Sequence, residues 1–236
     1  MSELIRPSTV LPAVRKPISF TTDDGLTLIG EVATPEGPIT SSLLCLHPNP
    51  AGGGMMDSHI YKKAANRLPA MAGIQVIRFN TRGTSSEAGT SEGVFDNGDA
   101  EVADVQAAID YSFNVLKVQK LWVVGWSFGT DLALRHAKDP RIAGLILLSP
   151  PMQRTTDTDL AYWQRDSRPV VAYVPERDEY LNPEQAATRF KDFSRLELVP
   201  VMGAKHLWVG EPFVHLILSE ITKWLAPERL PLPTEI

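Results

Sequence analysis

The chain lacks three features: paired cysteines, a long apolar run and a cluster of basic residues. Its 236 residues include one cysteine, Cys45, which excludes an internal disulfide, and the apolar run around it marks it as a small core residue. No run reaches the roughly 18 apolar residues that span a bilayer, and residues 1–16 lack the apolar segment of a secretory signal. We therefore expect a cytoplasmic protein without a membrane segment.

The charge balance is mildly acidic. A net charge of −5 without any Lys/Arg-rich run gives no electrostatic footprint for nucleic acid, so no nucleic-acid partner is expected. The sequence shows no metal-ligand spacing and no phosphate-binding loop, and we expect neither a metal nor another cofactor. Hydrophobic residues make up 43% of the chain and charged residues 22%, which favours a globular protein over a disordered one. These patterns leave the oligomeric state open.

Short β-branched runs alternate with longer helical patterns along the chain. Two runs around the turn Asp23-Asp24-Gly25 predict an antiparallel hairpin at residues 18–22 and 26–33. Further strands are expected at 42–47, 74–79, 120–126, 142–148, 170–174 and 196–201. Helices are expected at 60–71, 97–113, 128–138, from 183 onward, and at 213–225. This alternation predicts an α/β fold with a mostly parallel, doubly wound sheet and an N-terminal antiparallel hairpin.

The domain organisation is simple. No repeat, low-complexity stretch or linker divides the sequence, and its length fits one domain over residues 1–236. Residues 1–16 are expected to form an extended N-terminal segment, and the proline-rich residues 227–236 an irregular tail. Residues 149–168 have little helical pattern and are too few for a large cap domain, so none is expected.

One motif carries chemistry. Gly125-Trp126-Ser127-Phe128-Gly129 matches G-x-S-x-G, between a predicted buried strand and a predicted helix. In this setting a serine sits on a sharp, strained turn, and its close-packed neighbours two positions away must be small. The alternative is that the glycines only allow tight packing of a helix on a strand. The context favours Ser127 as a nucleophile.

A serine hydroxyl needs a base, and this fold supplies it in the chain order serine, acid, histidine. His206 follows the last predicted strand, whereas the other histidines lie on predicted helices or upstream of the serine. Those others are His47, assigned to loop structure, and His59, His136 and His215. Three carboxylates follow the strand at 170–174, and the pattern alone leaves Glu176, Asp178 and Glu179 open as the acid.

A tetrahedral intermediate needs two hydrogen-bond donors. The N–H of Phe128 follows the nucleophile at a helix N-terminus, where an anion is favoured. The second donor is expected from the loop after the strand at 42–47. Within Pro48-Asn49-Pro50 only Asn49 has a backbone N–H, and the two prolines stiffen the loop. The alternative for this loop is a simple flexible turn.

These motifs together resemble the α/β-hydrolase superfamily over nearly the whole chain. Within it, the sequence resembles small, capless bacterial hydrolases with a His-Pro-x-Pro loop, here His47-Pro48-Asn49-Pro50, followed by glycines and Met55. The segment Arg78-Phe79-Asn80-Thr81-Arg82-Gly83 and the acidic helix start at 95–101 follow in the same order.

This resemblance implies a triad of Ser127, Asp178 and His206 and oxyanion donors at Asn49 and Phe128. It also implies dienelactone-hydrolase-like or esterase-like chemistry. One departure is Thr130, where many relatives carry a small residue; it would tilt the helix slightly without removing a catalytic group.

The expected activity is hydrolysis of a small-molecule carboxylic ester through an acyl-enzyme. Amide, peptide or thioester hydrolysis on the same triad is an alternative, and so is a non-catalytic binding protein on this fold. Four apolar residues adjoin the predicted site in sequence or lie in the 149–168 stretch. They either line the substrate site or belong to the local core: Met55, Met56, Trp163 and Trp208.

Overall fold

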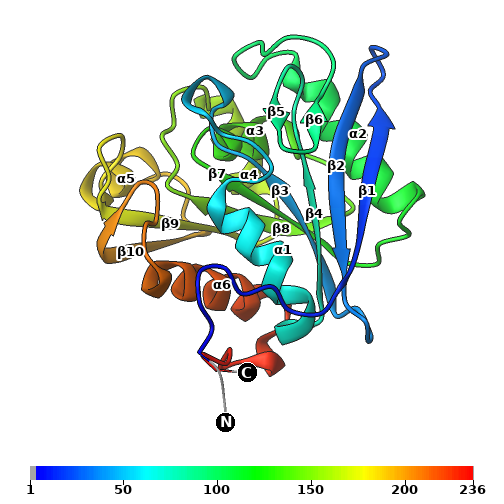
Figure 1. The fold of residues 1–236 in the computed structure, drawn as a ribbon. Helices are drawn as coiled ribbons and strands as arrows, with labels where there is room; N and C mark the ends of the chain where they lie inside the picture. Colours follow the sequence, from blue (N-terminus) through cyan, green and yellow to red (C-terminus); the bar gives the residue numbers. More distant parts are fainter. Residues whose placement is uncertain (1–3, 236) are drawn as a thin grey trace.

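The computed structural model describes residues 4–235, in which the main sheet has eight strands in the order β1-β2-β4-β3-β7-β8-β9-β10 (Figure 1). The β1–β2 and β2–β4 pairs are antiparallel, and every other pair is parallel. The strands are β1 (Val14–Thr21), β2 (Thr27–Thr34), β3 (Ser41–Leu46), β4 (Ile74–Phe79), β7 (Leu121–Trp126), β8 (Ile142–Leu148), β9 (Val170–Arg177) and β10 (Leu196–Lys205). A two-stranded ribbon, β5 (Ser85–Ser86) and β6 (Gly89–Thr90), projects from the loop after β4. The predicted sheet and N-terminal hairpin are confirmed.

Helices cover both faces of the sheet. In Figure 1, α1 (His59–Ala72) and α6 (Glu211–Leu225) lie on the near face, and α2 (Glu101–Asn114), α3 (Phe128–His136) and α4 (Asp157–Arg165) on the far face. The short α5 (Pro183–Arg189) connects β9 to β10. Strands β3, β4 and β7 are buried at every position, because apolar side chains meet helices on both sides. Each face of the sheet thus carries its own apolar core, and the two cores together hold the central strands in place.

The ends of the chain differ in part from the expected segments. Strand β1 already begins at Val14, inside the expected extended segment. Within the expected irregular tail, residues Pro227–Arg229 form a 3-10 turn. Residues 1–3 and 236, which belong to the same two expected segments, lie outside the described residues. No helix in the described part of the chain is long and apolar enough to cross a membrane.

The second helix begins later than predicted. It was expected from residue 97, but α2 starts at Glu101, because Asn97 and Gly98 have φ values of 57° and 104°, outside the helical region. The Glu101 carboxylate accepts the N–H groups of Asp96 at 2.9 Å and Gly98 at 2.7 Å. This buried carboxylate thus holds the preceding residues in a loop.

Residues 149–168 contain a helix that was not predicted. The Thr156 hydroxyl and the Asp159 carboxylate form reciprocal bonds to each other's backbone N–H, a capping box that starts α4. The indole N–H of Trp163 donates to the carbonyl of Leu134 at 2.8 Å, which fastens α4 to α3. The nine-residue α4 therefore lies against α3, and the fold has no large cap.

Candidate active site

Ser127 occupies the sharp turn between β7 and α3. Its backbone has φ 53° and ψ −122°, a conformation that is strained for a residue with a side chain. A Cβ atom on Gly125 would lie 2.3 Å from the carbonyl oxygen of Gly129, and one on Gly129 would lie 1.9 Å from that of Leu46. Glycine is therefore required on both sides of the serine, as the motif predicts.

Thr130 braces this turn. Its N–H and its hydroxyl both donate to the carbonyl oxygen of Ser127, at 2.8 Å and 2.7 Å. The residue by which this sequence departs from the resembling hydrolases therefore closes the first turn of α3 onto the serine.

Three side chains form one continuous hydrogen-bonded chain. Ser127 Oγ lies 2.8 Å from His206 Nε2, and His206 Nδ1 lies 2.9 Å and 3.0 Å from the two oxygens of Asp178. Asp178 Oδ1 also accepts the N–H of Tyr180 at 2.9 Å. The His206 and Asp178 side chains are only 6% and 1% exposed, so their interaction is largely shielded from water. This arrangement can move the serine proton to an oriented imidazole.

The parallel sheet explains why these distant residues meet. Ser127, Asp178 and His206 each follow the last residue of a parallel strand, β7, β9 and β10 respectively, and carboxyl ends of parallel strands share one sheet edge. The carbonyl of His206 accepts the Trp126 indole N–H at 3.2 Å and the Ser149 hydroxyl at 3.0 Å. Sequence reasoning missed both anchors, although Ser149 directly follows β8.

The structure brings Asp178, rather than its acidic neighbours, to His206. Glu176 Oε2 accepts the N–H of Gly203 at 2.7 Å, which links the ends of β9 and β10. Glu179 is exposed. Of the three carboxylates that the sequence pattern left open, Asp178 is therefore the one within hydrogen-bond distance of the imidazole.

The other histidines downstream of β3 lie away from Ser127, and two of them contact loop carbonyls. His59 Nε2 lies 2.6 Å from the carbonyl of Leu207, next to His206, and the His59 ring meets the edge of Trp126. Burial lowers the pKa of His59 and of His136, and His136 Nε2 lies 2.7 Å from the carbonyl of Gly98. His215 lies within α6. None of these contacts reaches Ser127.

The two predicted oxyanion donors lie on adjoining segments. The close approach of Gly129 to the carbonyls of Leu46 and His47 places the start of α3 against the end of β3. The Asn49 side chain accepts the N–H of Ala51 at 3.0 Å, and the Asn49 carbonyl accepts those of Gly52 and Gly54. Within residues 4–235, neither the Asn49 N–H nor the Phe128 N–H has an acceptor, which leaves both able to bind an anion.

A family model described as alpha/beta hydrolase fold matches residues 42–199, which include Ser127 and Asp178. The chain belongs to this family. A 33% identical relative, an uncharacterized protein of Rickettsia prowazekii (strain Madrid E), matches over 134 residues, 56% of this chain. The chain spans about half the length of that curated relative, 53% of it.

Solved structures agree with this membership. An alpha-beta serine hydrolase homologue from Coxiella burnetii is 26% identical, with a TM-score of 0.71, over 90% of this chain and 96% of that one. A lidless serine hydrolase of Xanthomonas campestris has a TM-score of 0.75 at 24% identity, over 93% and 99% of the two chains. A Pyrococcus furiosus esterase has a TM-score of 0.75 at 18% identity, over 94% of this chain and 98% of that one. The latter two likenesses show the shared fold.

Burial corrects the predicted lining of this α/β hydrolase's site. Trp163 and Trp208 are 0% exposed and Met56 is 3% exposed, so these three belong to the core and offer no surface to a substrate. Met55 alone of the four is partly exposed. Within the described residues, no group of three or more His, Cys, Asp or Glu side chains could hold a metal ion.

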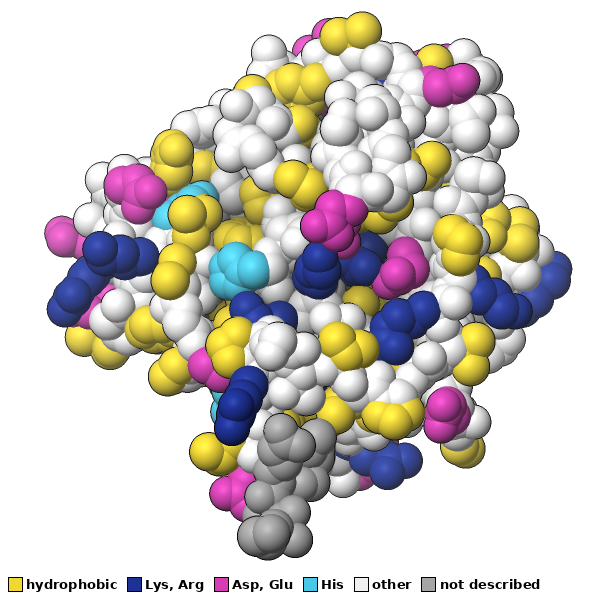
Figure 2. Space-filling view, in the orientation of Figure 1, with side chains coloured by type: hydrophobic (Ala, Val, Ile, Leu, Met, Phe, Trp, Pro, Cys, Tyr) yellow, Lys and Arg dark blue, Asp and Glu magenta, His cyan; other side chains and the backbone are white. Residues whose placement is uncertain are grey.

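Exposed apolar side chains lie close to His206 in space or in sequence. Tyr180 lies with its ring centroid 4.6 Å from that of His206 and is 51% exposed. Leu207 and Val209, on the loop after β10, are 52% and 69% exposed. Figure 2 shows histidine side chains between exposed apolar ones on the face that it draws. The signal for Leu207 and Val209 was their position just after His206, and for Tyr180 its position just after Asp178. Their exposure was not readable from the sequence.

Proposed function

We propose that this α/β hydrolase is a serine hydrolase that cleaves small carboxylic esters through an acyl-enzyme on Ser127. One observation supports this most strongly: the unbroken hydrogen-bonded chain from Ser127 Oγ through His206 to Asp178, with links of 2.8 Å and 2.9 Å. A nucleophile, a base and an orienting acid in this order are the requirements of acyl transfer.

The proposed reaction has two halves. Ser127 Oγ attacks the ester carbonyl carbon while His206 Nε2 takes the hydroxyl proton, and the carbonyl oxygen becomes an oxyanion that accepts the N–H groups of Asn49 and Phe128. His206 then gives its proton to the leaving alcohol as the carbon–oxygen bond breaks. Water attacks the acyl-enzyme with His206 again as base, the acid leaves, and Ser127 recovers its proton. Asp178 stabilises the imidazolium in both halves.

The surroundings of Ser127 favour small substrates. Ser127 is partly exposed, α4 lies against α3, and the apolar surface beside His206 consists of the exposed Tyr180, Leu207 and Val209. Each methylene that a pocket buries contributes about 0.8 kcal/mol. An open surface buries few of them, so long acyl chains gain little.

Amide, peptide and thioester bonds are alternatives on the same triad, because the leaving group is selected by contacts beyond these three residues. A binding protein without catalysis is a further alternative on this fold. The intact triad favours an enzyme, since a scaffold has no need of a shielded acid behind the histidine.

The test is a panel of p-nitrophenyl esters with matched anilides and thioesters, together with a fluorophosphonate probe. The wild type should hydrolyse the esters and take up the probe, whereas Ser127→Ala should lose about 10⁴-fold or more in kcat. Ser167→Ala, at an exposed serine after α4, is the control and should retain both properties. Equal probe uptake by Ser127→Ala would contradict the proposal.

A further inference from the structure

The loop that carries Asn49 begins at a buried histidine with two backbone partners. His47 is 0% exposed; its Nε2 accepts the N–H of Thr81 at 3.0 Å, and its Nδ1 lies 2.7 Å from the carbonyl of Pro48. Because Thr81 N–H can only donate, Nε2 must accept and Nδ1 must carry the proton. Burial lowers the pKa of His47 to about 4, so the ring is neutral and able to accept. The start of the loop is therefore tied to the segment after β4.

The other end of the same loop is tied to the same segment. The N–H of Met56 donates to Asn80 Oδ1 at 2.9 Å, and the carbonyl of Met56 accepts Arg78 NH1 at 3.0 Å. Asn80 is 0% exposed, and its Nδ2 donates to the Ser86 hydroxyl at 2.9 Å. Both ends of residues 47–56 are thus bonded to residues 78–81, at the end of β4.

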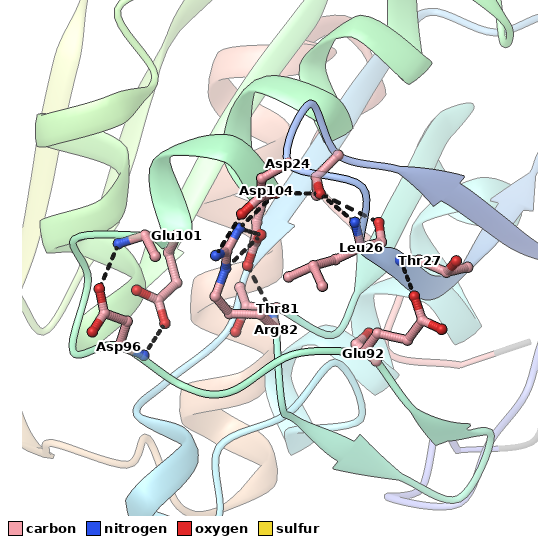
Figure 3. A network of polar contacts seen from close by, with 12 residues as sticks. Asp24, Leu26, Thr27, Thr81, Arg82, Glu92, Asp96, Glu101 and Asp104 are labelled. Atoms are coloured by element: carbon pink, nitrogen blue, oxygen red, sulfur yellow. Dashed lines mark hydrogen bonds and ion pairs between the residues drawn. The ribbon is translucent and has the colours of Figure 1, made fainter.

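The segment after β4 is anchored by ion pairs of Arg82, which Figure 3 shows. Arg82 lies between Asp104 of α2 and Asp24 of the β1–β2 turn. Its backbone N–H, Nε and NH2 all donate to Asp104, at 2.8 Å, 3.0 Å and 2.8 Å. Asp104 is 0% exposed, and burial raises its pKa while the Arg82 guanidinium opposes that rise. A buried, multiply bonded ion pair of this kind resists displacement, because losing one partner leaves a buried charge.

We propose that Asn80 is a positioning residue of the hydrolytic reaction, which holds the Asn49 N–H in place for the oxyanion through Met56. The inference rests on the proposed function, since an oxyanion arises only if Ser127 acts as nucleophile. Oxyanion donors act because they are aimed before the reaction, and a displacement of about 1 Å costs on the order of 10²-fold in rate. Asn80 touches no substrate; it acts by fixing one end of the loop while Thr81 and His47 fix the other.

The test compares Asn80→Ala with Asn80→Asp and with Gln75→Ala. Asn80→Ala should lower kcat by about 10- to 100-fold and change KM by less than about twofold, because the displaced donor serves the transition state more than the ground state. Binding of a trifluoromethyl ketone, which forms a tetrahedral adduct, should weaken by a similar factor. Asn80→Asp keeps the acceptor for Met56 N–H and should recover most of kcat.

Gln75→Ala is the matched control. Gln75 is a buried amide like Asn80, but it lies in β4 at the opposite end from Asn80 and bonds to Ser42 and Thr34. Its loss should lower stability without changing kcat per probe-titrated site. If Asn80→Ala does not fold, His47→Asn serves instead: its amide NH2 retains a donor for the Pro48 carbonyl, but its side chain is too short to place an acceptor where Nε2 now accepts the Thr81 N–H.

Amide hydrogen exchange separates failure of this inference from failure of the proposed function. The Met56 N–H should exchange faster in Asn80→Ala than in the wild type, whether or not any ester is cleaved. Faster exchange with an unchanged kcat in an active enzyme would overturn the positioning role, and so would unchanged exchange. A wild type that neither cleaves esters nor takes up the probe would instead refute the function on which the inference rests.

Discussion

Acidification should destabilise the protein through His47, far more than a surface histidine would. The pKa of His47 falls from 6.5 to about 4 on folding, because the ring is fully buried. Between these values the unfolded chain takes up a proton that the folded protein does not, so the free energy of unfolding falls as pH falls. Protonation of Nε2 would also set an N–H against the N–H of Thr81, which now donates to it at 3.0 Å.

The size of the effect follows from the two pKa values. One pKa unit corresponds to about 1.36 kcal/mol, and the uptake integrated from pH 7 to pH 5 gives about 2 kcal/mol, or a fall of about 4–8 °C in Tm for a chain of this length. Other groups also titrate in this range, so the assay is a difference: urea unfolding of the wild type and of His47→Gln at pH 7 and at pH 5.

The wild type should lose about 2 kcal/mol more than His47→Gln between the two pH values. Between pH 7 and pH 8, where His47 is neutral in the folded protein and mostly neutral in the unfolded chain, the two proteins should differ by less than about 0.2 kcal/mol in their change. An equal loss in both proteins between pH 7 and pH 5 would refute the reasoning, since it would mean that His47 takes up its proton without unfolding.

Three further predictions concern the site. Asp178→Asn should lower kcat by about 10²- to 10⁴-fold by upsetting the His206 tautomer. Glu176→Gln alters a carboxylate that contacts only the Gly203 N–H and Arg177 among the described residues, so it should stay within a few-fold of the wild type; the reverse order would move the acid to Glu176. Gly129→Ala should destabilise the fold by about 3 kcal/mol or more and reduce probe uptake, because its Cβ would lie 1.9 Å from the Leu46 oxygen; a stable, fully active variant would contradict the elbow geometry. Among p-nitrophenyl esters, kcat/KM should peak from acetate to butyrate and fall by octanoate, and a steady rise through dodecanoate would indicate an enclosed acyl pocket.

The fold was largely predictable because its signals are local. Runs such as Ile74–Phe79 are buried on both faces, and their uniform apolar character marks a central parallel strand. Ser127 was predictable for a related reason: a strand, a tight turn and a helix must follow one another in sequence. The capping box of Thr156 and Asp159 was equally local, and attention to it would have predicted α4.

Features that depend on side-chain direction were not predictable. The choice between Glu176 and Asp178 depends on where β9 ends, and the strand runs to Arg177, three residues beyond the predicted end. Trp208 follows His206 closely in sequence, but its backbone has φ 52° and its side chain is 0% exposed. The contact between His47 and Thr81 joins residues 34 positions apart, and only the assembled sheet brings them together.

The central claim is that Ser127 becomes acylated, and mass spectrometry of the quenched enzyme tests it most directly. After brief mixing with p-nitrophenyl butyrate and an acid quench, a butyryl group should appear on the peptide that contains Ser127. It should accumulate further in Asp178→Asn if deacylation is slowed more than acylation, and be absent in Ser127→Ala. A butyryl group on any other residue, or turnover without any adduct on Ser127 when deacylation limits the rate, would contradict the account.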